Sequence, residues 1–103
     1  MESAVDILAE ITLFPGSISG KTSGYFSGVR PNHFFSGQPS SIVGVIWFEN
    51  QFNAELGSTT TAKVRLMYPE TYPPLVAGTT WRIQEGSRHV GNAKVVQLLP
   101  TNQ

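Results

Sequence analysis

The chain has 103 residues, 40% of them hydrophobic and 14% charged, a composition typical of one small folded domain. Its formal net charge is zero, which gives no general attraction to nucleic acid or to an anionic membrane, and no apolar run is long enough to span one. The absence of cysteine excludes disulfides, zinc thiolates and thiol catalysis, and it fits a reducing, cytoplasmic compartment. We expect residues 1–103 to form a single domain.

Short extended segments separated by turn residues make up the first half of the chain. Apolar residues at every second position predict a strand over residues 7–13, which Pro15 and Gly16 end. The Ser/Gly-rich segment at residues 17–24 predicts a mobile loop. Further extended segments are expected at residues 25–26, 33–35 and 42–49. The last of these, IVGVIWFE, is apolar at nearly every position and predicts a central strand that is buried on both faces.

The second half shows the clearest strand patterns. Residues 59–66, TTTAKVRL, alternate between polar and apolar side chains, and a Pro-rich loop follows at residues 68–78. A closing hairpin then runs from Trp81 to Leu99, with Trp81 and Ile83 expected in the core, a turn at residues 85–87 and a bulge at Gly91-Asn92. No helix of ordinary length is expected. The pattern indicates an all-β sandwich or barrel.

One motif suggests nucleotide binding, but its chemistry is incomplete. Residues 16–22, GSISGKT, end in G-K-T after a strand, as a phosphate-binding loop does. The first glycine of that motif would fall on Pro15, which has no amide hydrogen to donate. The following SGYFSGVRP cannot open a helix, so we expect no nucleotide here.

The titratable residues do not form a catalytic pattern. His33 and His89 are the only imidazoles, and neither has a patterned acidic neighbour or a marked nucleophile nearby. Two distant histidines are also too few for a metal site. We therefore expect no enzyme activity, no metal and no cofactor. The aromatic side chains are expected mainly in the core, although an exposed minority could stack on bases.

Two stretches resemble the C-terminal β-barrel domain, the third domain, of bacterial elongation factor Tu and its relatives. They are residues 22–35, TSGYFSGVRPNHFF, and residues 82–96, RIQEGSRHVGNAKVV. The order and spacing of the similar segments are kept from about Ala9 to Leu99. The resemblance implies a single six-stranded antiparallel barrel of the Greek-key type.

In that family this domain has no active site, and one of its faces holds the acceptor and T-stem backbone of aminoacyl-tRNA. The resemblance carries the tRNA-facing positions to Lys21, Asn32, Glu85 and Gly86. The chain departs from the family pattern at Gly20, Asn32 and Ser87, and these 103 residues hold no counterpart of the GTPase and second domains. The fold is expected to transfer, whereas the activity does not follow from it.

Two functions in different classes are therefore expected. The first is translation-related binding of tRNA or ribosomal RNA through a mildly basic face, because residues 57–103 carry five basic and two acidic side chains. Its candidate residues are Lys63, Arg65, Arg82, Arg88 and Lys94.

The alternative is a protein-interaction module of the partner-docking, immunity or adaptor type, which could also associate with itself and has no nucleic-acid role. The Tyr/Pro-rich loop offers an aromatic patch for it at Tyr68, Tyr72, Pro73 and Pro74. That loop can equally be structural and cross one end of the barrel. The turn from Glu85 to Arg88 also has two interpretations. It either serves the backbone alone, or it presents Arg88 to a phosphate or carboxylate.

Overall fold

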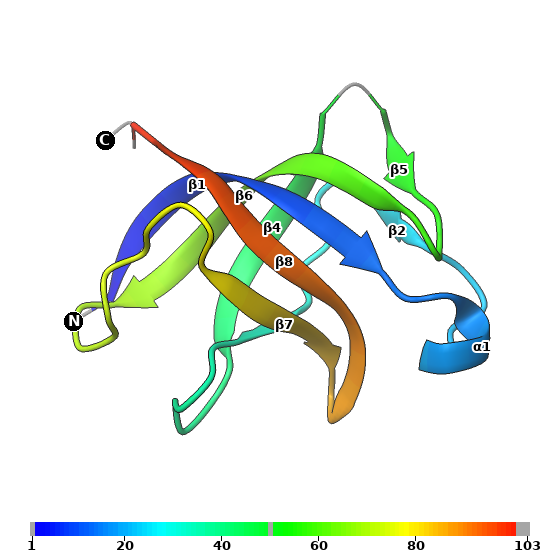
Figure 1. Cartoon of the computed structure of the whole chain (residues 1–103), viewed down its shortest axis with the longest axis horizontal. Helices are drawn as coiled ribbons and strands as arrows, with labels where there is room; N and C mark the ends of the chain where they lie inside the picture. The colour runs from blue at the N-terminus through cyan, green and yellow to red at the C-terminus, as the bar shows by residue number, and fades with distance from the viewer. Residues whose placement is uncertain (1, 50, 101–103) are drawn as a thin grey trace.

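Six strands close into an antiparallel barrel (Figure 1). The computed structural model describes residues 2–49 and 51–100. The barrel strands are β1 (Glu2–Leu13), β3 (Asn32–Phe34), β4 (Ile42–Phe48), β6 (Thr59–Pro69), β7 (Thr80–Glu85) and β8 (Arg88–Leu99). Outside the barrel lie the short helix α1 (Gly16–Ser19) and a two-stranded sheet of β2 (Tyr25–Phe26) and β5 (Asn53–Ala54). Figure 1 shows these extra elements at one end of the molecule, opposite the start of β1 and the end of β8.

The strand order around the barrel is β1-β6-β4-β3-β7-β8, and β8 pairs with β1 to close it. Three barrel strands that follow one another in the chain, β3, β4 and β6, are neighbours, and β7 then returns to the free side of β3. This arrangement is a Greek key. The prediction of an all-β, six-stranded antiparallel barrel is confirmed. Among the described residues, no helix is long and apolar enough to cross a membrane.

The alternating strands bury the faces that the sequence predicts. In β1 the odd-numbered residues from Ile7 to Leu13 are buried, and Trp81 and Ile83 of β7 are buried as expected. Strand β1 begins at Glu2, earlier than predicted, because its pairing with β6 extends to the partners Glu2 and Pro69. Backbone pairing therefore lengthens the strand beyond the segment with clear alternation.

Strand β4 corrects the prediction that residues 42–49 are buried on both faces. Ile42, Ile46 and Phe48 face the core, whereas Val43 is 59% exposed and Trp47 is 38% exposed. The prediction was wrong because a closed six-stranded barrel covers only its inner face, and no second layer of the described chain lies over the outer side of β4. Apolar side chains therefore remain on the outside of this strand.

The bulge in β8 lies one position earlier than predicted. Ile83 pairs with Gly91 and Gln84 pairs with His89, so the extra residue is Val90 and not the predicted Gly91-Asn92 pair. Val90 and Gly91 are consequently buried in succession. A second irregularity, between β1 and β8, leaves Val96 as the extra residue, because the partners of Leu8 and Ala9 are Gln97 and Val95. Both irregularities bend a long strand around the barrel.

A buried polar contact ties β3 to β7 inside the barrel. The indole nitrogen of Trp81 donates a hydrogen bond of 2.9 Å to Nδ1 of His33, and the ring of Phe35 stacks on Trp81 with 5.1 Å between centroids. Because an indole N–H can only donate, Nδ1 must be unprotonated, and the neutral ring carries its hydrogen on Nε2. A side chain at Gly44 would place Cβ 2.6 Å from that Nε2. Glycine at this position therefore makes room for the imidazole.

Replacing Trp81 by alanine is expected to lower the free energy of unfolding by about 3–5 kcal/mol, because the substitution removes a buried ring and leaves a cavity. Trp47→Ala is the matched control on the outer surface, and it is expected to cost less than about 1 kcal/mol. Urea unfolding of both variants measures the difference. Equal costs for the two tryptophans would contradict the burial that the structure assigns to them.

The acid stability of the fold is expected to depend on His33. Burial lowers the pKa of His33 to about 4, from 6.5 in the unfolded chain. Between these values the unfolded chain binds the extra proton, so the free energy of unfolding falls as the pH is lowered from 6.5 toward 4. The expected slope is about 1.4 kcal/mol per pH unit, for a total loss of roughly 3 kcal/mol.

Urea unfolding across this pH range measures that slope. His33→Asn keeps an acceptor for Trp81 without the titration, and it should lose the slope in the upper part of this range. His89→Asn, which changes the histidine outside the core, should keep it. At about pH 4 the carboxylates of Asp6 and Glu85, whose pKa values are lowered in the folded chain, add a slope of the same sign in all of these proteins. A wild-type profile that is flat between the two pKa values would show that His33 does not carry this dependence.

Candidate functional site

The predicted basic residues do not gather on one face. Lys63 and Arg65 lie on β6, whereas Arg82 lies on β7. Two strands separate β6 from β7 in either direction around the barrel, so these side chains lie on opposite sides. Arg88 and Lys94 lie on β8, next to β7. The net positive charge of residues 57–103 is therefore spread around the barrel.

One end of the barrel does bring predicted residues together. Lys21, Glu85, Gly86 and Arg88 lie there with Tyr25, which was not predicted as a site residue, and we call this group the turn cluster. The ammonium of Lys21 and the hydroxyl of Tyr25 both donate to Oε2 of Glu85, each at 2.7 Å. Burial opposes ionisation of Glu85, but the hydrogen bonds from Lys21 and Tyr25 and the charges of Lys21 and Arg88 hold its pKa below the ordinary value. Burial, together with the bond to Glu85, raises the pKa of Tyr25. This carboxylate fastens the segment around α1 to the end of β7.

The turn cluster leaves little free charge for a ligand. The side chain of Lys21 is only 13% exposed, and its charge is already paired with Glu85. Arg88 is exposed, forms no ion pair among the described residues, and lies beside Gly20. Asn32 pairs with Gln84, one residue before Glu85, so it lies nearby on β3. The loop predicted to be mobile is thus fastened by Lys21, and Arg88 is the main charge that the cluster presents to solvent.

Gly86 occupies the hairpin turn with a φ of +60°. This left-handed conformation favours glycine, as the sequence predicts for a tight turn. An added Cβ would meet no atom within 4 Å, so the constraint is in the backbone and not in the surrounding space. The structural interpretation of the turn therefore accounts for Gly86 without any ligand.

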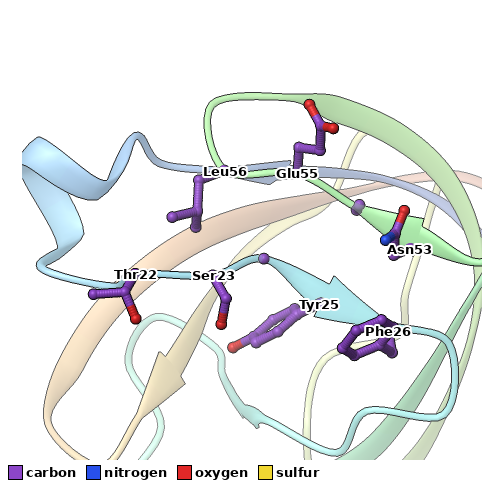
Figure 2. Close-up of a pocket in the computed structure, with 9 residues that line it drawn as sticks. Thr22, Ser23, Tyr25, Phe26, Asn53, Glu55 and Leu56 are labelled. Carbon is purple, nitrogen blue, oxygen red and sulfur yellow. The ribbon is translucent and has the colours of Figure 1, made fainter.

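A shallow groove of about 320 Å³ lies beside the turn cluster (Figure 2). Figure 2 shows Thr22, Ser23 and Tyr25 on one side of it and Asn53 and Glu55 on the other. The Tyr25 hydroxyl is already bonded to Glu85, and Glu55 is the one charged side chain in the lining of the groove. Within the described part of the chain, no three histidine or acidic side chains lie close enough together to hold a metal ion.

The Tyr/Pro-rich loop turns most of its aromatic surface inward. Tyr68, which the sequence assigned to this loop, belongs to the end of β6, because β6 continues to Pro69. It is buried and packs edge-on against Phe35 and Tyr72, with centroids 5.4 and 5.5 Å apart. The Tyr68 hydroxyl donates to the carbonyl of Pro73, and the Tyr72 hydroxyl donates to the carbonyl of Ser40 at 3.2 Å. These contacts agree with the interpretation that this loop crosses and closes one end of the barrel.

The most distinctive surface is the outer side of β1, β6 and β4, which we call the β6 face. Its side chains lie in rows set by the strand register. Asp6, Arg65 and Val45 form one row, and Leu8, Lys63 and Trp47 form the next. Ala4, Met67 and Val43 form a third row. Ala4 pairs with Met67, and Met67 and Val43 are the next residues along their strands beyond the pair of Leu66 with Gly44. Val43, Trp47 and Met67 are all exposed.

Two charged contacts fix the centre of the β6 face. Nε and Nη2 of Arg65 donate to the two carboxylate oxygens of Asp6, at 2.7 and 2.9 Å. The hydrogen bond from Arg65 is the main reason that the pKa of Asp6 is lowered, although burial opposes it. The Asp6 side chain is 2% exposed, whereas that of Arg65 is 41% exposed. The ammonium of Lys63 lies 5.9 Å from the centre of the Trp47 ring. A rigid guanidinium and an exposed indole are thus presented side by side.

The sequence identified Lys63 and Arg65 but missed the other members of this face. Val43 and Trp47 belong to a uniformly apolar run, which contains no signal for the side that faces solvent. The contact of Asp6 with Arg65 could have been predicted, because an acidic side chain at an outward position of β1 lies directly opposite Arg65. Finding it requires the pairing of β1 with β6, because Asp6 and Arg65 are 59 positions apart in the chain.

Compared with known proteins, the sequence matches no family model and no curated protein. The resemblance to the elongation factor Tu barrel therefore remains a prediction about the family. The geometry of the turn cluster and the β6 face has to carry the functional argument.

Glu85→Gln is expected to loosen the segment around α1, because it removes the charge that pairs with Lys21. We expect a loss of about 1–2 kcal/mol in the free energy of unfolding, since the site is partly exposed to solvent. Arg88→Ala is the matched control, and it should leave the melting temperature nearly unchanged. Thermal unfolding measures both, and hydrogen exchange of residues 16–24 should accelerate only in Glu85→Gln. A larger loss in Arg88→Ala would contradict this assignment.

Proposed function

We propose that this chain is a non-catalytic binding module that docks onto a protein partner through the β6 face. The observation that supports the proposal is the exposed apolar group Val43, Trp47 and Met67 around the fixed Arg65. Exposed apolar surface on a small domain commonly marks an interaction site. Tryptophan, methionine and arginine are the side chains enriched in the centres of protein interfaces.

The fixed orientation of the Arg65 side chain also favours docking of a protein at this face. A long side chain that is free in solution loses conformational entropy when a partner immobilises it. Asp6 already holds Arg65 through two hydrogen bonds, so most of that loss has occurred before binding. Trp47 has only two side-chain torsions and is flanked by Lys63. The β6 face is therefore preorganised for contact with a partner. The turn cluster is not, because its Lys21 is covered.

Translation-related binding of tRNA or ribosomal RNA is the second candidate. The exposed ring of Trp47 beside Lys63 is the observation that favours it, because bases stack on aromatic rings next to cations. Against it, Lys21 is covered and paired with Glu85, the other predicted basic side chains are spread around the barrel, and the chain has no net charge. We rank protein binding first for these reasons. Either role suits the reducing cytoplasm that a chain without cysteine fits.

The proposal is tested by recovering partners of the tagged full chain from its own cells. Trp47→Ser should lose a specific protein partner that the wild type retains, because the anchor at the centre of the interface is gone. Phe52→Ser is the matched control, since Phe52 is an exposed aromatic residue outside the β6 face. Ribonuclease should not change the result.

Two outcomes would contradict protein docking at this face. One is an identical partner set for the wild type and Trp47→Ser. The other is a partner that disappears on ribonuclease treatment and whose binding weakens steeply with salt, which would favour RNA. Circular dichroism and thermal unfolding establish that both variants keep the barrel.

A further inference from the structure

We infer that the partner segment on the β6 face is acidic as well as apolar, so that its carboxylates meet Lys63 and Arg65 while its apolar side chains cover Trp47, Val43 and Met67. This inference rests on the proposed function and adds the chemistry of the partner. The inference depends on which hydrogen-bond donors and acceptors of the β6 face are not already paired within the chain.

The β6 face offers side-chain donors without a free side-chain acceptor. In the three rows described above, Asp6 is the one acidic side chain, and it is almost completely covered. Both of its oxygens accept hydrogen bonds from Arg65. The remaining members, apart from Arg65 and Lys63, are apolar: Ala4, Leu8, Val43, Val45, Trp47 and Met67. A partner must therefore bring the acceptors.

The number of open donors makes this requirement strong. Arginine has five N–H groups, and Arg65 uses two of them on Asp6, which leaves three. The Lys63 ammonium has three N–H groups, and its contact in the structure is with the ring of Trp47. Covering these donors with a purely apolar partner would leave them buried and unpaired, which is costly. Carboxylate oxygens on the partner satisfy them with charge-assisted bonds.

The position of the acids on the barrel indicates where the partner's charge lies. Glu10 pairs with Thr61, one row beyond Leu8 and Lys63, so a second carboxylate at that end of the face would be repelled. The row of Asp6, Arg65 and Val45 lies on the other side of Lys63, farther from Glu10, and the carboxylate of Asp6 in that row is covered and paired with Arg65. We therefore place the partner's carboxylate between Lys63 and Arg65, with apolar side chains over Val43, Met67 and Trp47.

Selection of peptides from a random library displayed on phage, with the intact chain immobilised, tests this chemistry. The enriched peptides should combine Asp or Glu with Leu, Phe, Met or Trp. Synthetic copies should bind Lys63→Gln about tenfold more weakly than the wild type, the loss expected for one charge-assisted hydrogen bond. Arg82→Gln removes a cation on the opposite side of the barrel and should bind normally. Phe52→Ser should also bind normally, and thermal unfolding checks the fold of each variant.

The outcomes separate this inference from the proposal on which it rests. In one outcome the peptides lose binding to Trp47→Ser, but they are not enriched in acidic residues or they bind Lys63→Gln as well as the wild type. That outcome would overturn the inference that the partner is acidic and would leave the proposal of docking at the β6 face intact. Peptides that bind Trp47→Ser as tightly as the wild type, or no enrichment at all, would overturn both. Binding of poly(U) that is lost in Trp47→Ser would also overturn both and assign the face to nucleic acid.

Discussion

Closure of the barrel is the constraint on which the rest of this structure depends. Each strand has one face inside and one outside, so the core is filled by alternate side chains and the other half of every strand must meet solvent or a partner. The hydrogen bond between Trp81 and His33 lies within that core and joins β7 to β3. The same closure leaves the apolar outer side of β4 uncovered. The same geometry thus fills the core and leaves an apolar surface on the outside of the barrel.

Internal pairing decides which charges remain open to solvent. Glu85 holds Lys21 and Tyr25 at one end of the barrel, and Asp6 holds Arg65 on the β6 face. The two pairs have different consequences. Lys21 becomes covered, whereas Arg65 stays substantially exposed and is fixed in one orientation. A count of basic residues along the chain therefore says little about the surface potential, because it does not show which charges are already satisfied.

Much of the fold could be predicted from local patterns, and the errors have a common cause. Alternation identified the inner faces of β1, β6 and β7, because most of the outward positions in these strands are polar. It failed for β4, where Val43 and Trp47 are apolar and outward, because periodicity is absent when both faces are apolar. The site was harder still. The contact of Asp6 with Arg65 and that of Lys21 with Glu85 each join distant parts of the chain, and only the strand pairing brings them together.

Oxidative footprinting of the protein, once purified and once in an extract of its own cells, tests the central claim most directly. The account predicts that Trp47 and Met67 become protected in the extract, while the exposed rings of Phe26 and Phe52 keep their reactivity. These two phenylalanines, which stack edge-on with centroids 5.7 Å apart, provide the internal reference outside the β6 face. Unchanged reactivity at Trp47 and Met67, with protection at Phe26 and Phe52 instead, would contradict docking through the β6 face.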